Sequence, residues 1–284
     1  MTRDLAVDAE LESEYNNMAR RPDASALLQQ LAAVSASYRA EADSILDCRY
    51  GSHARETLDI FRCGCAHAPL FVYLHGGYWQ RGDKSIYSYI AQPFNRVGVD
   101  VAVIGYPLCP EVSMTGLVQS LRKAIIWLYR NAASHGIDPD RINLSGHSAG
   151  GHLTALALAT RWPELERDLP ADLLKTAIPI SGLYLLEPLR HTTIGDALRL
   201  TDSETRNLSP ALLSAAHAAP MLTIVGGAET SAFFQQADSL QEAWSRPGFI
   251  IERYTEPNAD HFDVVARLQS SDSAIFQRIA DWLS

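Results

Sequence analysis

Gly146-His147-Ser148-Ala149-Gly150 is the stretch that decides the fold of this chain. It matches G-x-S-x-G, the pattern of a serine held on a sharp turn between a strand and a helix. The context fits, since residues 141–145 read as an apolar strand and residues 149–160 as a helix. The positions two before and two after the serine must be small, because strand and helix backbones pass close together there. The pattern therefore predicts that Ser148 is a nucleophile.

The elements around this turn predict an α/β protein. Apolar runs typical of strands occupy residues 57–61, 70–74, 99–104, 141–145, 176–180, 221–225 and 249–254. Helical patterns occupy residues 8–42 with a break at Arg21-Pro22, then 115–134, 149–160, 231–244 and 260–283. Strands that alternate with helices indicate a mostly parallel central sheet with helices on both faces. The run 57–61 alternates like a half-buried strand.

We expect one domain over residues 1–284. Residues 1–42 would form an N-terminal helical segment. Residues 182–219 interrupt the alternation of strands and helices, and we interpret them as a small cap, with a long crossover as the alternative.

A second motif, His75-Gly76-Gly77-Tyr78-Trp79, follows the expected strand 70–74. Acyl transfer builds negative charge on a carbonyl oxygen, and a Gly-Gly turn lets backbone N–H groups point at that oxygen. We expect an oxyanion hole around Gly76 and Gly77, with the N–H groups of Gly77, Tyr78 and Ala149 as donors. His75 is expected to form structural hydrogen bonds.

Chain order selects the base and the acid. In α/β proteins with a nucleophilic serine on such a strand–helix turn, the catalytic residues follow one another along the chain as serine, acid and histidine. The histidine comes after the last strand. His261 fits, whereas His191 and His217 precede the candidate acid. Glu229 is the first carboxylate after the strand 221–225 and is the predicted acid. The alternatives are Asp238, which lies inside the next helix, and Asp260 and Asp263, which are too close to His261 in sequence to orient it.

Together the two motifs resemble the kynurenine formamidase (arylformamidase) branch of the α/β hydrolases, near the hormone-sensitive-lipase-like esterases. Further matches extend along nearly the whole chain, in the order Tyr15-Asn16-Asn17, Leu58-Asp59-Ile60-Phe61, Gly150-Gly151-His152-Leu153, Ser181-Gly182-Leu183-Tyr184, Ser209-Pro210 and His261-Phe262. The resembling family usually carries an aspartate as the triad acid, so Glu229 is a departure.

The resemblance implies the α/β-hydrolase fold and a Ser148–His261–Glu229 triad that removes a small acyl group, formyl first, from an aromatic amine or alcohol. N-formyl-kynurenine, an intermediate of tryptophan catabolism, is the implied type of substrate. Tyr78 and Trp79 directly follow the expected oxyanion glycines and are expected to wall the substrate pocket, with a core position under the loop as the alternative for Trp79. Arg81 and Lys84 are the cations nearest in sequence that could bind a substrate carboxylate. A short-chain carboxylesterase is the alternative enzyme, and a non-catalytic binding module is the alternative outside enzymes.

Composition narrows the class of protein. The net charge of -9 disfavours nucleic acid, whose phosphates need basic partners. The chain shows no signal peptide and no apolar run of membrane-spanning length, so a cytoplasmic location is expected. The four cysteines are read as free thiols, and no metal or cofactor motif is present. The expected partner is a small acyl amide or ester, and the sequence leaves the oligomeric state open, a homodimer included.

Overall fold

A computed structural model of the chain describes residues 5–216 and 218–283. Its centre is an eight-stranded sheet in the order β1-β2-β4-β3-β5-β6-β7-β8. The strand β2 pairs antiparallel with both β1 and β4, and every other neighbouring pair is parallel. This is the mostly parallel sheet that the sequence predicts. The strands are β1 (Ser44–Arg49), β2 (Thr57–Phe61), β3 (Leu70–Leu74), β4 (Asp100–Ile104), β5 (Ile142–His147), β6 (Thr176–Ile180), β7 (Met221–Gly226) and β8 (Ile251–Glu256).

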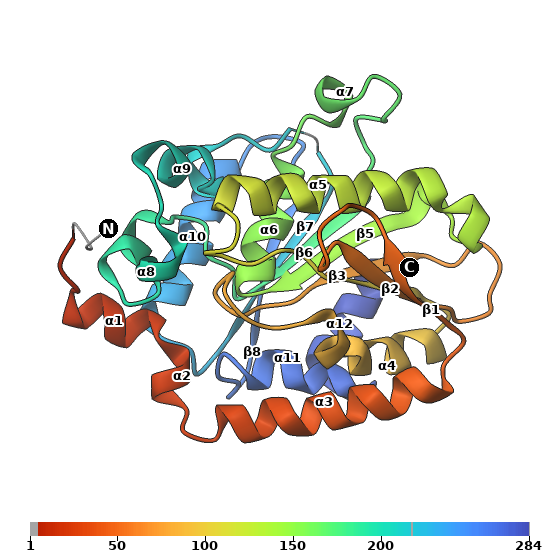
Figure 1. Ribbon diagram of the computed structural model, residues 1–284, viewed down its shortest axis with the longest axis horizontal. Coiled ribbons are helices and arrows are strands. Elements are labelled where there is room, and N and C mark those ends of the chain that lie inside the picture. The colour runs from red at the N-terminus through yellow and green to blue at the C-terminus, as the bar shows by residue number, and fades with distance from the viewer. Residues whose placement is uncertain (1–4, 217, 284) are drawn as a thin grey trace.

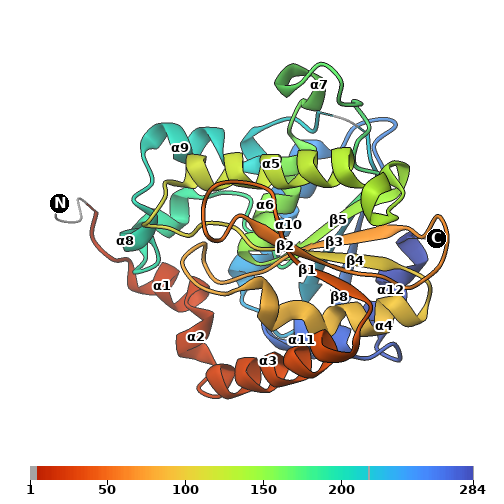
Figure 2. The ribbon, with the colours of Figure 1, turned by 45° about the vertical axis from the view of Figure 1, so that its right-hand side comes forward.

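Helices cover both faces of the sheet (Figure 1). On one face lie α5 (Met114–Asn131), α6 (Ala149–Leu158) and α10 (Ser231–Trp244). On the other lie α3 (Ala24–Glu41), α4 (Ala91–Arg96), α11 (Asp263–Ala266) and α12 (Ala274–Leu283), and a view turned by 45° shows the same two layers (Figure 2). The core divides accordingly into two apolar clusters, one on each side of the sheet. Because the parallel strands are buried on both faces, their sequences are near-continuous apolar runs.

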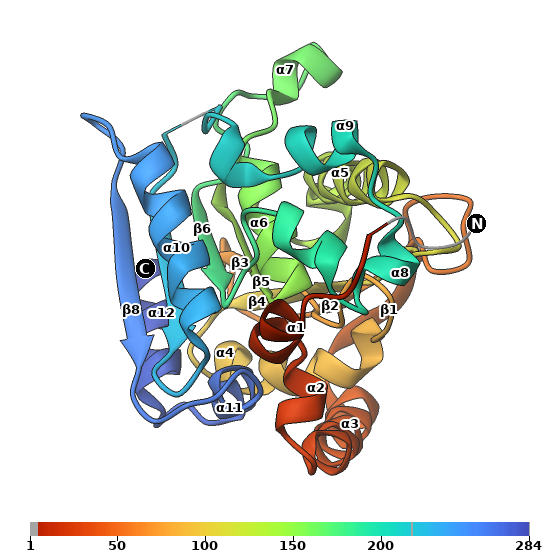
Figure 3. The same cartoon turned by 90° about the vertical axis from the view of Figure 1, so that its left-hand side faces the viewer.

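The remaining helices lie around the ends of the strands. Helix α7 (Trp162–Leu165) projects from the body, while α8 (Gly195–Leu198) and α9 (Asp202–Asn207) belong to the segment 182–219. The first helix, α1 (Ala9–Tyr15), packs against α10, and α2 (Asn17–Arg20) leads from it to α3 (Figure 3). Pro22 separates α2 from α3, which is the break that the sequence predicts.

Register places the predicted motifs side by side. Leu74, the last residue of β3, pairs with Gly146 in β5, and Gly226, the last residue of β7, pairs with Glu256 in β8. The loops that follow β3, β5, β6, β7 and β8 therefore leave neighbouring strands at one edge of the sheet. Open α/β sheets bind ligands at this carboxyl edge.

Three sequence expectations about elements are corrected. Strand β1 went unrecognised because its ladder is irregular between Ile45 and Cys48 and Asp47 has φ 56°. Strand β2 is buried at all five positions rather than half-buried, since Lys84 pairs with the inward carboxylate of Asp59 at 2.6 Å.

The stretch 260–283 is two helices with a break between them instead of one helix. The Ser273 hydroxyl donates to the carbonyl of Ser270, and the backbone N–H of Asp272 donates to the Ser270 hydroxyl. These local bonds compete with helical ones.

Within the described residues, no helix combines the length and apolar character that crossing a membrane requires.

Candidate active site

Ser148 sits on a strained turn between β5 and α6. Its φ of 56° and ψ of -115° are a conformation that side chains other than glycine rarely adopt. A Cβ on Gly146 would lie 2.4 Å from the carbonyl oxygen of Gly150, and a Cβ on Gly150 would lie 2.0 Å from that of Leu74. The small residues of the motif are therefore a steric requirement of the turn.

The loop after β3 lies directly against this serine. A Cβ on Gly76 would come within 3.2 Å of the Ser148 Cβ, so only glycine lets the loop approach so closely. Gly77, Tyr78 and Trp79 follow with φ values of 121°, 55° and 58°. The Gly77 carbonyl accepts the N–H groups of Gln80 and Arg81, which closes the turn.

Three backbone N–H groups in the loop after β3 and at the start of α6 are the candidate oxyanion donors. Among backbone contacts of the described residues, the N–H groups of Gly77, Tyr78 and Ala149 have no acceptor. Ala149 is the first residue of α6, whose dipole also favours negative charge at this point. The arrangement offers the donors that an oxyanion needs.

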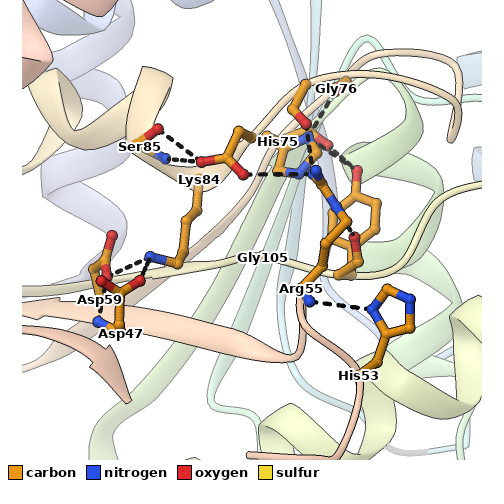
Figure 4. A network of polar contacts seen from close by, with 12 residues as sticks. Asp47, His53, Arg55, Asp59, His75, Gly76, Lys84, Ser85 and Gly105 are labelled. Atoms are coloured by element: carbon orange, nitrogen blue, oxygen red, sulfur yellow. Dashed lines mark hydrogen bonds and ion pairs between the residues drawn. The ribbon is translucent and has the colours of Figure 1, made fainter. Parts of the chain in front are cut away.

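A polar network contacts the segment His75–Trp79, which we name the oxyanion loop after its predicted role (Figure 4). His75 is fully buried, its Nδ1 bonds to the Gly76 carbonyl at 2.7 Å, and its ring stacks on Tyr106 at 4.2 Å. The Arg55 guanidinium donates to the carbonyls of Gly82 and Tyr106. Burial lowers the pKa of His75 to about 4, so the ring stays neutral and serves as a structural hydrogen-bonding group.

His261 and Glu229 form a buried pair. His261 follows β8 and Glu229 follows β7, and the distance from His261 Nδ1 to Glu229 Oε2 is 3.0 Å. The Glu229 side chain is fully buried and its other oxygen accepts the backbone N–H of Gly226 at 2.9 Å and the hydroxyl of Ser181. A carboxylate on Nδ1 leaves the opposite nitrogen of the ring free to act as a base.

Ser181 is a site residue that sequence reasoning did not single out. It lies directly after β6 with φ 47°, and its backbone N–H donates to the carbonyl of Ile224 at 2.7 Å. Its position could have indicated it, since Ser181 directly follows the predicted strand 176–180. In the sequence, that strand lies between the strand before Ser148 and the strand before Glu229.

The alternative acids are engaged elsewhere. Asp238 lies in α10, is exposed, and pairs with Arg253. Asp260 and Asp263 hold the Arg21 guanidinium at 2.8 Å and 2.6 Å. His191 pairs with Glu187 at 3.6 Å, and His217 lies outside the described residues.

Two aromatic rings pack against His261. His147, the residue before the serine, lies 4.5 Å from it between ring centroids, and Phe233 lies 4.6 Å away. Burial holds the pKa of His147 well below its usual range, and within the described structure its Nε2 has no hydrogen-bond partner. His147 is thus a neutral packing ring beside the candidate base.

Ser148 and His261 line one cavity with a volume of about 130 Å³. Gly76, Gly77 and Tyr78 form part of its wall. Met18 of α2 and Leu28 of α3 also line it, so the N-terminal helices border the cavity, whereas no described residue of 182–219 lines it. The described residues contain no cluster of three or more metal-binding side chains.

Of the two expected substrate-binding residues, one lines the cavity and the other does not. Tyr78 lines the cavity, whereas Trp79 is fully buried beneath the loop and donates to His152 Nδ1 at 3.2 Å. Of the two alternatives for Trp79, the structure favours the core position under the loop over the pocket wall. Lys84 is also removed from the site by its ion pairs with Asp47 and Asp59, while Arg81 lies in the cavity wall.

The chain is similar in sequence and fold to several known proteins. The sequence pattern of the BD-FAE family matches residues 58–244. The kynurenine formamidase of Salmo salar is 29% identical over 247 residues, which cover 84% of this chain and 82% of that protein. Esterase LipQ of Mycobacterium tuberculosis is 27% identical, over 95% of this chain and 68% of its own length. The crystal structure of a putative thioesterase from Silicibacter sp. TM1040 is 32% identical, with a TM-score of 0.84, and covers 96% of this chain and 100% of that one.

Proposed function

The chain belongs to the BD-FAE family and has the α/β-hydrolase fold, and we propose that it is an arylformamidase that uses Ser148, His261 and Glu229 as a catalytic triad. The observation that carries the proposal is the buried Glu229–His261 pair, whose histidine lines one small cavity together with Ser148 and the oxyanion loop. The similarity to a kynurenine formamidase over most of both chains supports a formyl amide as the substrate.

In the proposed mechanism, His261 takes the proton of the Ser148 hydroxyl as the oxygen attacks the carbonyl carbon. The N–H groups of Gly77, Tyr78 and Ala149 bind the oxygen that becomes negative. His261 then protonates the leaving amine, and a water molecule, activated by the same histidine, releases the acid from Ser148. Glu229 holds the ring of His261 and stabilises its protonated form.

The cavity supports a small acyl group. Its volume of about 130 Å³ is below the range of typical ligand sites, about 300–1,000 Å³. A formyl group adds one hydrogen to the carbonyl carbon, so nearly all of the space remains for the leaving group. An aryl amine is also a better leaving group than an alkyl amine, which makes a formanilide a suitable amide for this machinery.

A short-chain carboxylesterase is the second candidate, since LipQ is an esterase and matches 95% of this chain. The experiment that separates the two compares kcat/KM for formanilide and N-formyl-kynurenine with values for aryl acetate, butyrate and longer esters. An arylformamidase favours formyl over longer acyl groups and turns over the formanilide. Preference for butyrate or longer chains without formanilide hydrolysis would assign the carboxylesterase instead.

A further inference from the structure

We propose that Arg21 is a positioning residue of the active site. It holds the turn that carries His261 and offsets negative charge beside that ring, so that the ring stays unprotonated, and able to act as a base, at lower pH. The inference rests on the proposed function for the role of His261 as the base. It adds a residue of the N-terminal segment that the proposed mechanism does not use.

Two carboxylates flank His261 on the turn after β8, and they share one cation. Asp260 Oδ1 accepts the backbone N–H groups of Phe262 and Asp263, each at 2.8 Å. Its carboxylate therefore shapes the turn on which His261 lies. Nη1 of Arg21 donates to Asp260 Oδ1 at 2.8 Å and to Asp263 Oδ1 at 2.6 Å. One guanidinium thus bonds to both carboxylates from a position 239 residues before Asp260 in the chain.

Arg21 is itself held in place at the junction of α2 and α3. Its backbone N–H donates to the carbonyl of Asn17, its carbonyl accepts the N–H of Ala24, and Pro22 follows it. Its Nε donates to Asp23 at 3.1 Å, and one-fifth of its side chain is exposed. Because the guanidinium is already ordered, its bonds to the turn cost little additional conformational entropy.

Charged groups from several elements surround His261. Among the described residues, those that line the active-site cavity or the neighbouring cavity that also borders His261, or that lie on its turn, comprise three carboxylates and three guanidinium groups, namely Glu229, Asp260, Asp263, Arg20, Arg21 and Arg81. The other titratable rings there are neutral, because burial lowers the pKa of His147 and raises the pKa of Tyr78 and of Tyr87 to about 12. Loss of Arg21 would therefore leave uncompensated negative charge on the turn, which favours a protonated imidazole.

The test follows the protonation of His261 by two readouts. The first is the pH midpoint of the acid limb of kcat/KM for phenyl acetate, a substrate that does not ionise. The second is the NMR titration midpoint of the His261 ring, whose signal is identified by its absence from His261→Gln. Arg21→Gln should raise both midpoints by about 0.5–1 pH unit, because it removes a positive charge near the ring. Asp263→Asn removes a negative charge and should lower both midpoints by a similar amount.

These opposite shifts separate charge from structure, because both substitutions break a bond of the same cluster. The double variant Arg21→Gln/Asp263→Asn restores the net charge and should return the midpoints to near the wild-type values. Arg21→Lys keeps the charge and should stay near them, while salt from 0.02 to 0.5 M should shrink the shift in Arg21→Gln. Midpoints that move in the same direction in Arg21→Gln and Asp263→Asn, or that do not move, would overturn the role in charge.

The hold on the turn has its own readout, which is kcat on the plateau above the acid limb. Arg21→Gln should lower this plateau about threefold with little change in KM, since a looser turn misplaces the base but leaves the cavity wall intact. Arg21→Lys should recover part of it, whereas the double variant should not recover it. A plateau equal to that of the wild type in Arg21→Gln would overturn the role in holding the turn.

Arg130→Gln is the matched control. Arg130 also bonds to two carboxylates, Glu166 at 2.7 Å and Asp168 at 2.8 Å, but none of the three residues belongs to the described lining of either cavity. Its loss should leave both midpoints and the plateau unchanged. A shift in Arg130→Gln as large as that in Arg21→Gln would assign the effect to the net charge of the whole protein and overturn the proposal.

The NMR readout keeps this test independent of the proposed function. Titration midpoints that follow the predicted pattern in a protein that hydrolyses neither phenyl acetate nor formanilide would support Arg21 and contradict the proposed function. Turnover with an acid limb that ignores Arg21 would support the proposed function and overturn this inference.

Discussion

At the residue scale, Glu229 is predicted to orient His261 as the acid of the triad. Its carboxylate is fully buried, bonds to His261 Nδ1 at 3.0 Å, and is held by Ser181 and Gly226. We expect Glu229→Gln to remain folded and to lose about 10³- to 10⁴-fold in turnover, because the amide can favour the wrong tautomer of the histidine. The matched control is Asp238→Asn, since Asp238 is exposed and pairs with Arg253. Steady-state kinetics in which Asp238→Asn is the damaging change would move the acid to Asp238.

Several of these residues were predictable from the sequence because sterics and chain order restrict them. The glycines at 146 and 150 are required by backbone contacts within the turn, and the order serine, acid, histidine selects Glu229 and His261 among many carboxylates and nine histidines. The position of Trp79 stayed open because a motif fixes the path of the backbone but not the side of a loop that a ring faces. Ser181 was missed because its contact with Glu229 joins residues that only the sheet brings together.

At the element scale, the first two helices are bound to the oxyanion loop. The Tyr78 hydroxyl accepts the backbone N–H of Asn17 at 2.8 Å and donates to the Tyr15 carbonyl at 3.0 Å. The same helices reach the other side of the site, since Glu14 bonds to Ser231 and Ala232 at the start of α10. The segment that contains α1 and α2 therefore bridges the oxyanion loop and the element that follows Glu229.

We expect Tyr78→Phe to lower the free energy of unfolding by about 1–3 kcal/mol, because it leaves the buried N–H of Asn17 without a partner. Release of the segment should speed tryptic cleavage after Arg20 and reduce kcat about tenfold. Tyr50→Phe is the control, since the Tyr50 hydroxyl also makes two buried bonds, to Gly105 and Ser120, but away from this segment. If both variants are cleaved at the same rate, the hydroxyl of Tyr78 does not hold the segment.

Sequence periodicity predicted the central strands closely and the peripheral elements less well. Strands such as β3 and β6 match residue for residue, since burial on both faces demands continuous apolar runs. Which helices cover the active-site cavity was harder to predict. The helices over the cavity come from the N-terminal segment, and α8 and α9 of 182–219 contribute no described residue to its lining. Such a role depends on tertiary packing, which local patterns do not encode.

On the scale of the whole molecule, buried neutral histidines make stability depend on pH. Burial lowers the pKa of His75 and of His152 to about 4, and holds that of His147 well below its usual range. Unfolded histidines bind protons near pH 6.5. Between about pH 6.5 and 4 the unfolded chain therefore binds more protons than the folded protein, and stability falls as the pH falls through this window.

Urea unfolding at pH 7, 6 and 5 measures this effect, and a histidine variant separates it from the carboxylates, which begin to titrate near pH 5. Each buried histidine contributes a slope of up to about 1.4 kcal/mol per pH unit. His152→Gln should reduce the slope by one group, because it removes one buried neutral ring. A free energy of unfolding that stays level from pH 7 to 5 would be inconsistent with neutral buried rings.

The central claim is that Ser148 is the nucleophile, and covalent labelling tests it most directly. The protein is incubated with a fluorophosphonate, and intact mass and peptide mapping locate the adduct. We predict one adduct per chain on Ser148, loss of all turnover in proportion to labelling, and no adduct on a folded Ser148→Ala variant, whose turnover falls by several orders of magnitude. An adduct on another residue, or near-wild-type turnover in Ser148→Ala, would contradict the account.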